Sequence, residues 1–242
     1  MTNDIEKVRQ LTSEIGGWLS DSEGELLYKL AKNVPSGQNI VELGGWKGKS
    51  TVWLAKGTEA GQGNKVYSID PHCRSKAHIS EGERDTYPAF LTNLTKAGIQ
   101  ATVIPLVTTS DKAAKRWREM VGLLWIDASH DYQDVKHDLL SWKRHLLPGA
   151  IVALHDCDQP GPAQVVEEYL KHSSDFTIMQ SVDTTVVAAK EGCIHYWILD
   201  SKEVGRCKYC GKVRDFRKLR QEKSKHKGLK SQKSSKVHED KG

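Results

Sequence analysis

Short apolar runs alternate with longer amphipathic segments along most of the chain. Short runs of β-type residues predict strands, and apolar residues spaced three and four positions apart predict helices. The expected strands are 39–43, 65–69, 101–107, 123–126 and 150–154. The helices expected between and after them are 50–56, 87–97, 112–121, 131–145 and 162–172. Strands that alternate with helices indicate a doubly wound α/β fold, in which helices cover both faces of a mainly parallel sheet.

The two ends of this pattern differ from its middle. Before the first strand, the apolar residues between positions 26 and 34 have helical spacing, and Ser22 with Glu25 is typical of a capping box at a helix start. After the last helix, the runs 176–179 and 185–189 are too close to hold a helix between them, so we expect an antiparallel hairpin. The sheet should therefore have seven strands, one of them antiparallel to the rest.

Length and composition bound the class of protein. The 242 residues suffice for one full domain and an appendage, and 38% hydrophobic with 28% charged residues is the mixture of a globular chain. No run approaches the roughly 18 apolar residues of a membrane span, and the first residues lack the features of a secretory signal. We therefore expect a cytoplasmic protein with no membrane contact, whose five cysteines are thiols or metal ligands rather than a disulfide scaffold.

Charge is distributed unevenly along the chain. Residues 206–242 contain 14 basic and 4 acidic residues, a balance of +10, whereas the rest of the chain carries a balance of −5. Beyond Phe216 almost no residue is apolar, so this part is expected to be disordered. The sequence thus predicts a domain over 1–190, a small module over 191–217 and a basic tail over 218–242. The module and tail are candidates for contacting nucleic-acid phosphates or a protein partner, unless the tail only aids solubility.

A glycine-rich segment joins the first strand to its helix. It reads Val41-Glu42-Leu43-Gly44-Gly45-Trp46-Lys47-Gly48-Lys49-Ser50. Glycines let the backbone turn tightly and approach a ligand, but the spacing of a phosphate-binding P-loop is missing. The carboxylate of Glu42 disfavours a pyrophosphate, and Asp70 at the end of the next strand is of the type that binds ribose hydroxyls. A ribose without a pyrophosphate points to S-adenosylmethionine.

These motifs resemble class I S-adenosylmethionine-dependent methyltransferases, in particular the small-molecule O-methyltransferase branch that includes sugar-modifying enzymes. The resemblance covers about residues 15–190 and is carried by the segments 17–20, 40–51, 66–71 and 123–138. It implies a Rossmann-like methyltransferase fold and a small hydroxyl-bearing acceptor. The cofactor-binding residues that we expect are Glu42, Gly44, Gly45, Gly48, Ser50, Asp70, Ser110 and Asp127.

Two acidic clusters end the fourth and fifth strands. Asp127 and His130 follow one strand, and His155 and Asp156 follow the other. The sheet should bring Asp127 and Asp156 together on one divalent ion such as Mg²⁺. In the metal-dependent sugar O-methyltransferases that these positions resemble, an Asp binds the metal and a His three residues later is the base. His155 stands where those enzymes carry a carboxylate, which favours a transition metal. The alternative is structural, with Asp127 capping the next helix and the histidines bonding to backbone.

A second metal site is predicted near the C-terminus. Cys193 and His195 precede Cys207 and Cys210, and Cys-x-x-Cys-Gly is typical of a zinc knuckle. The four side chains would form a tetrahedral Cys₃His set in a small zinc ribbon. The alternatives are ordinary thiols or a redox pair, although the thioredoxin-like context of a redox pair is missing.

Three functions remain open at this level. The first is methyl transfer from S-adenosylmethionine to a small-molecule hydroxyl, with His130 as base and Asp127 beside it. The second is methylation of a nucleic acid that the ribbon and tail hold. The third is a non-catalytic binding module that keeps the fold. The acceptor and the oligomeric state do not follow from the sequence.

Overall fold

The computed structural model of the chain describes residues 2–73, 85–192, 197–207 and 213–218. The chain divides into two compact units, Met1–Gly192 and Cys193–Gly242. Of the basic tail predicted over 218–242, only Lys218 is among the described residues.

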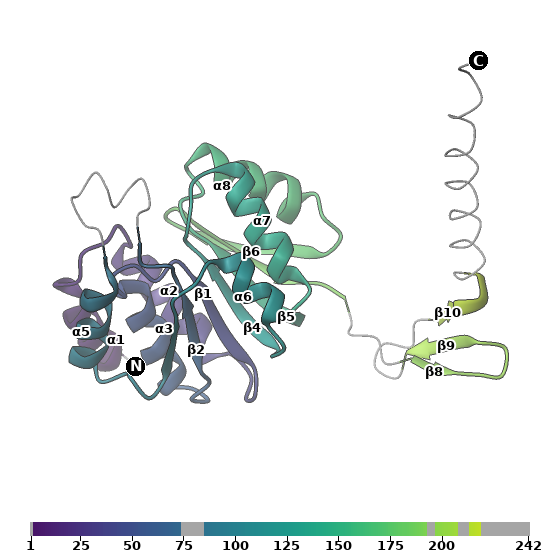
Figure 1. Cartoon of the computed structure of the whole chain (residues 1–242), viewed down its shortest axis with the longest axis horizontal. Coiled ribbons are helices and arrows are strands. Elements are labelled where there is room, and N and C mark those ends of the chain that lie inside the picture. Colours follow the sequence, from purple (N-terminus) through teal and green to yellow (C-terminus); the bar gives the residue numbers. More distant parts are fainter. Residues whose placement is uncertain (1, 74–84, 193–196, 208–212, 219–242) are drawn as a thin grey trace, which may run out of the picture. The chain divides into compact units, whose positions relative to one another are not determined.

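The larger unit is built on a seven-stranded sheet with the order β3-β2-β1-β4-β5-β7-β6 (Figure 1). The strands are β1 Asn39–Leu43, β2 Val66–Ile69, β3 Val103–Leu106, β4 Val121–Ile126, β5 Leu146–Leu154, β6 Phe176–Val182 and β7 Thr185–Lys190. Strand β7 runs antiparallel to both of its neighbours, and the pairs among β1 to β5 are parallel. The prediction of a mainly parallel sheet with one antiparallel strand is confirmed. The strand order reverses between β1 and β4, which is where open sheets of this kind bind ligands.

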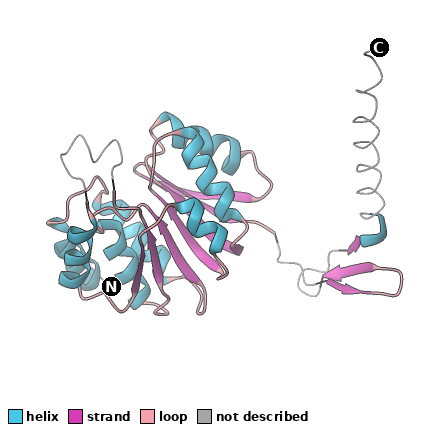
Figure 2. Ribbon diagram, viewed as in Figure 1, coloured by secondary structure: helices cyan, strands magenta, loops and turns pink. Residues whose placement is uncertain are grey.

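Helices cover both faces of this sheet (Figure 2). They are α1 Thr2–Ser13, α2 Asp21–Lys32, α3 Lys49–Glu59, α5 Tyr87–Ala97, α6 Ser110–Arg116, α7 Tyr132–Lys143 and α8 Pro160–Val165, which the π-helical segment η1 Val166–Lys171 continues. One hydrophobic core joins Trp53 of α3 to Trp125 of β4, and a second core joins Leu124 of β4 to Trp142 of α7. Successive strand residues point to opposite faces, so β4 supplies both cores and reads as a continuous apolar run.

The boundary between α6 and β4 differs from the prediction. The helix expected over 112–121 is wrong at its end, because α6 stops at Arg116 and Val121 already begins β4. Trp117 has an extended backbone, is buried, and packs edge-on against Tyr67 with ring centroids 4.7 Å apart. Burial of this large ring outweighs the helical propensity of Arg118, Glu119 and Met120, which follow it.

The N-cap residue of helix α2 is Ser20, two residues before the N-cap that the sequence predicted. The Ser20 hydroxyl accepts a hydrogen bond from the Glu23 N–H at 3.1 Å, and the Ser20 N–H donates to the Glu23 carboxylate at 3.0 Å. The box predicted for Ser22 and Glu25 is therefore wrong. Both pairs have the same spacing, and the buried position of Glu23 selects the earlier one.

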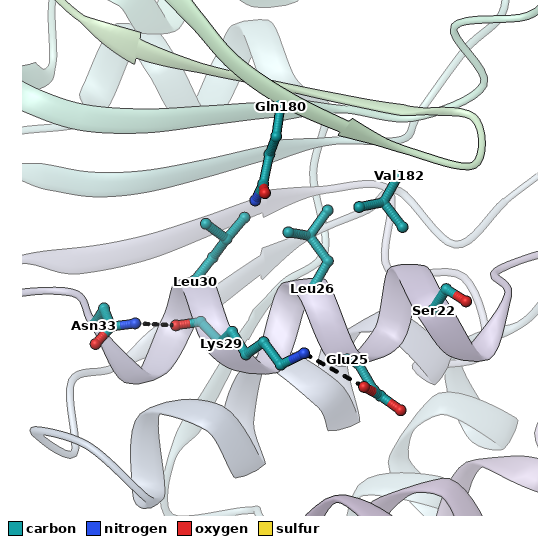
Figure 3. A pocket seen from close by; sticks show the side chains of 8 residues that line it. All are labelled: Ser22, Glu25, Leu26, Lys29, Leu30, Asn33, Gln180 and Val182. Atoms are coloured by element: carbon teal, nitrogen blue, oxygen red, sulfur yellow. Dashed lines mark hydrogen bonds and ion pairs between the residues drawn. The ribbon is translucent and has the colours of Figure 1, made fainter.

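A hollow of about 390 Å³ lies between α2 and β6 (Figure 3). Leu26 and Leu30 line it from the helix and Val182 from the strand, and Lys29 lies 3.4 Å from the Glu25 carboxylate at its edge. No candidate site residue lines this hollow. The chemistry predicted from the sequence is therefore placed elsewhere, at the carboxyl ends of the strands.

Candidate active site

The glycine-rich turn between β1 and α3 packs directly on the end of β4. Gly44 has a φ of +92°, and a Cβ atom there would overlap the backbone carbonyl oxygen of Asp127. The Asp127 N–H donates to the Leu43 carbonyl at 2.9 Å, which continues the β1–β4 pairing beyond the strands. Gly48 is the N-cap of α3 with a φ of +90°, and its N–H donates to the Gly45 carbonyl at 2.7 Å. The predicted cofactor loop therefore adjoins the predicted reaction centre.

Glu42 lies beneath this loop with no exposed surface. Its carboxylate accepts hydrogen bonds from the hydroxyls of Ser50, Thr51 and Ser68, each at 2.6 Å. Burial raises the pKa of Glu42 to about 7, against the lowering effect of these hydroxyls. The sequence placed Glu42 and Ser50 among the cofactor contacts. In the structure these two side chains bond to each other and support the loop from inside.

Asp70 braces the same loop from the end of β2. One of its carboxylate oxygens accepts the Trp46 N–H at 2.8 Å, and the other accepts the His72 N–H at 2.6 Å. The side chain is almost fully buried, with 7% of the residue exposed. A carboxylate oxygen has two lone pairs, so each oxygen keeps one acceptor position for a further hydroxyl.

Ser110 begins α6, where the sequence placed a residue beside the cofactor. Its hydroxyl accepts a hydrogen bond from Trp142 Nε1 at 2.9 Å and bonds to Asp138 of α7. Burial raises the pKa of Asp138 to about 6, and the bond to Ser110 partly offsets this. The Ser110 side chain is thus engaged in the packing of α6 on α7. The sequence did not reveal this partner.

The structure brings Asp127, His155 and Asp156 together. One ligand-type atom from each lies within 4.8 Å of the others. His155 Nδ1 lies 3.1 Å from the Asp127 carboxylate and 3.2 Å from the Asp156 carboxylate. The backbone N–H of His155 donates to the backbone carbonyl of Ile126 at 3.1 Å, so the pairing of β4 with β5 sets the position of the cluster. The donor set, two carboxylates and one imidazole, fits a divalent transition metal.

The other ring nitrogen of His155 contacts a residue that sequence reasoning missed. His155 Nε2 lies 3.3 Å from the carboxylate of Glu23, which comes from α2. Burial of His155 lowers its pKa, but hydrogen bonds to Asp127, Asp156 and Glu23 outweigh this and raise the pKa to about 12. Burial alone would raise the pKa of Glu23, whereas its hydrogen bonds to His155, Ser20 and Thr184 lower it to about 2.

His130 lies at the edge of this cluster with an exposed ring. Its Nε2 lies 2.7 Å from the Asp156 carboxylate, and the Asp156 backbone has a φ of +51°. Asp131, the next residue, is the N-cap of α7 and accepts the backbone N–H of Gln133 at 2.8 Å. The alternative that Asp127 caps the helix after β4 is therefore wrong, because Asp131 caps α7.

The smaller unit contains a three-stranded antiparallel sheet with the order β10-β9-β8. The strands are β8 Trp197–Leu199, β9 Val204–Cys207 and β10 Val213–Asp215. The rings of Trp197 and Phe216 meet edge-on, with centroids 5.4 Å apart. Of the predicted zinc ligands, Cys207 ends β9, and Cys193, His195 and Cys210 lie outside the described residues.

Comparison with known families adds to this geometry. Residues 41–157 match a protein-family model described as a methyltransferase domain. The chain carries a methyltransferase domain. The matched segment begins in β1 and ends just after Asp156, so it contains both the glycine loop and the acidic cluster of this methyltransferase.

Solved structures share the fold. An O-methyltransferase from Bacillus cereus in complex with SAH is 18% identical, covers 78% of this chain and 91% of its own, and has a TM-score of 0.57. The O-methyltransferase TomG from Streptomyces achromogenes, in complex with SAM, is 19% identical over 78% and 90%, with a TM-score of 0.56. A methyltransferase from Geobacter sulfurreducens is 21% identical over 78% and 89%, with a TM-score of 0.57. The expected S-adenosylmethionine-dependent methyltransferase fold is confirmed.

Among the residues that the structure describes, no helix combines the length and the apolar character needed to cross a lipid bilayer.

Proposed function

We propose that this methyltransferase transfers the methyl group of S-adenosylmethionine to a hydroxyl oxygen of a small-molecule acceptor. The observation that carries this proposal is the close packing of the Gly44 backbone on Asp127, which puts the glycine loop beside the acidic cluster. The O-methyltransferases of Bacillus cereus and Streptomyces achromogenes, whose structures are complexes with SAH and SAM, support the choice of cofactor.

The glycine loop would hold the cofactor through its backbone. A Cβ atom at Gly44 would overlap the Asp127 carbonyl oxygen, and one at Gly45 would overlap the Ser68 hydroxyl, so only glycines let the loop pack this closely. Helix α3 begins after Gly48 without a side-chain cap, which leaves its first N–H groups available to a ligand. Asp70 keeps one acceptor position on each oxygen for ribose hydroxyls. Glu42 supports the loop from below. S-adenosylmethionine supplies an electrophilic methyl group on a sulfonium ion.

His130 would take the proton of the acceptor hydroxyl. The acceptor oxygen forms a bond to the methyl carbon while the carbon–sulfur bond breaks, and that electron pair remains on sulfur. The hydroxyl proton passes to His130 Nδ1, the ring nitrogen on the side away from Asp156. The Asp156 carboxylate, 2.7 Å from Nε2, then stabilises the imidazolium that forms.

Asp127, His155 and Asp156 would hold a divalent ion beside the acceptor. The three donors already lie within 4.8 Å of one another, and an ion would displace the proton from His155 Nδ1. Such an ion lowers the pKa of a hydroxyl that it binds. An imidazole ligand favours Mn²⁺, Fe²⁺ or Zn²⁺ over Mg²⁺.

We also propose structural zinc and a phosphate-binding role for the smaller unit. The three short strands bury little apolar surface besides Trp197 and Phe216, so a metal would supply much of their stability. Arg206, Arg214 and Arg217 are exposed among the described residues, which supports contact with an anionic partner. Methylation of a nucleic acid held there is the second candidate function.

The cofactor site is tested by calorimetric titration of the full chain with S-adenosylmethionine. Gly44→Ala places a methyl group against the Asp127 carbonyl and should abolish binding. Gly37→Ala is the matched control, because Gly37 also has a positive φ, +78°, but open space around its Cβ position. It should bind like the wild type.

Two results would contradict the proposed cofactor. One is a folded wild-type protein that does not bind S-adenosylmethionine. The other is equal binding by the Gly44→Ala and Gly37→Ala proteins, which would place the cofactor away from the loop.

A further inference from the structure

We propose that Glu23 is a positioning residue of the active site, which orients the His155 ring through Nε2 so that Nδ1 faces Asp127 and Asp156. This inference rests on the proposed function, because it assigns a purpose to the ring orientation that a divalent ion needs. Glu23 belongs to α2 and lies 132 residues before His155 in the sequence.

The Glu23 carboxylate is held in place by donors other than His155. One oxygen accepts the Thr184 N–H at 3.1 Å, the Thr184 hydroxyl at 2.8 Å and the Thr185 hydroxyl at 2.9 Å. The second oxygen accepts the Ser20 N–H at 3.0 Å. Only 2% of the residue is exposed. These four hydrogen bonds therefore fix the plane of the carboxylate independently of His155.

Helix capping alone does not account for a carboxylate at this position. In a capping box, Glu and Gln both accept the N–H of the N-cap residue. Burial of a charged carboxylate is costly unless it is paired. The His155 ring supplies that pairing through Nε2, at 3.3 Å from Glu23. Glu23 therefore caps the helix through the Ser20 N–H and pairs with His155 through the same carboxylate oxygen.

The orientation that results matches that of a metal-binding histidine. A histidine that binds a metal through one ring nitrogen almost always donates its other N–H to a carboxylate, a carbonyl or water, which sets the orientation of the ring. Here Nε2 is directed to Glu23. Nδ1 is then left 3.1 Å from Asp127 and 3.2 Å from Asp156, the two carboxylates proposed to share the ion.

The test uses Mn²⁺ alone as the probe and the full chain. Glu23→Gln keeps the size of the side chain but leaves one acceptor oxygen for donors on two sides, the hairpin threonines and His155. We expect Mn²⁺ affinity to fall about 10- to 100-fold, measured by electron paramagnetic resonance of free Mn²⁺. A crystal structure of the metal-free variant should show the His155 ring turned so that Nδ1 no longer faces Asp127 and Asp156, whereas the wild type should keep the orientation described above.

Thr185→Val is the matched control. It removes one donor to Glu23 but leaves the Glu23 contact with His155, so it should lower thermal stability without weakening Mn²⁺ binding. Unchanged Mn²⁺ affinity in Glu23→Gln would overturn the proposal. Equal weakening in both variants would also overturn it, because Glu23 would then act only on stability.

A wild type that fails to bind Mn²⁺ would instead sink the metal part of the proposed function. The orientation of the His155 ring in the metal-free crystal structures then decides the role of Glu23 separately. A turned ring in Glu23→Gln but not in Thr185→Val supports the positioning role, and an unchanged orientation in Glu23→Gln overturns it.

Discussion

Of the five described non-glycine residues with a positive φ, three lie around the candidate active site, and Asp183 and Glu203 lie in hairpin turns. Trp46, His72 and Asp156 are not glycines, yet their φ angles are +41°, +51° and +51°. They follow β1, β2 and β5, and each lies beside a proposed site residue. Such conformations cost about 1–3 kcal/mol each, and they persist where the surroundings enforce them. Their clustering at three strand ends is independent support for a functional site there.

His130 is the residue whose role is most directly tested. Replacing His130 with Ala should reduce turnover about 100-fold or more, because no base then takes the acceptor proton, while S-adenosylmethionine binding is unchanged. Turnover is measured as release of S-adenosylhomocysteine with a panel of phenols and sugars.

His137→Ala is the control for that experiment. His137 is another exposed histidine, on α7, and its Nε2 lies 3.1 Å from Asp111 rather than from the acidic cluster. Its loss should leave turnover unchanged. Equal turnover in the two variants would remove His130 from the mechanism.

At the scale of elements, strand register assembles the site. Pairing of Leu43 with Ile126, and of Ile126 with Leu154, places the residues that follow β1, β4 and β5 side by side. The N-terminus of α2 is joined to the β6–β7 hairpin by hydrogen bonds, since the Ser20 hydroxyl donates to Asp183 at 2.6 Å. Helix α2 therefore delivers Glu23 to the site only when it is correctly capped and docked.

A pair of serine substitutions tests this capping. Ser20→Ala removes the side-chain cap and should lower the free energy of unfolding by about 1 kcal/mol. Ser22→Ala, at the position that the sequence pattern favoured, should change it by less than about 0.5 kcal/mol, because Ser22 is exposed. Urea denaturation of both variants gives the comparison. A larger loss for Ser22→Ala would show that α2 starts at the later position.

At the scale of the whole molecule, core and candidate site belong to one unit. Every residue of the two hydrophobic cores lies between Val8 and Ala188, and the candidate active-site residues lie between Glu23 and Asp156. The smaller unit has its own short sheet and ring pair. We therefore expect the methyltransferase unit to fold and to bind the cofactor by itself.

Truncation after Gly192 should therefore leave S-adenosylmethionine affinity equal to that of the full chain, measured by calorimetry. The same preparations are assayed for metal, and zinc should be present in the full chain and absent from the truncated one. Loss of cofactor binding on truncation would show that the smaller unit completes the site. Methylation of a nucleic acid lost on truncation would favour the second candidate function.

Local pattern determined the alternation of strands and helices, the antiparallel hairpin, the glycine loop and the acidic residues after β4 and β5. Each of these depends on residues a few positions apart, so periodicity and spacing carry the information. Tertiary structure decided the rest. It turned Ser110 toward Trp142, ended α6 early at the buried Trp117, and brought Glu23 across 132 residues to His155. Such choices depend on which side chains packing buries together, and burial between distant segments leaves no periodic signal in the sequence.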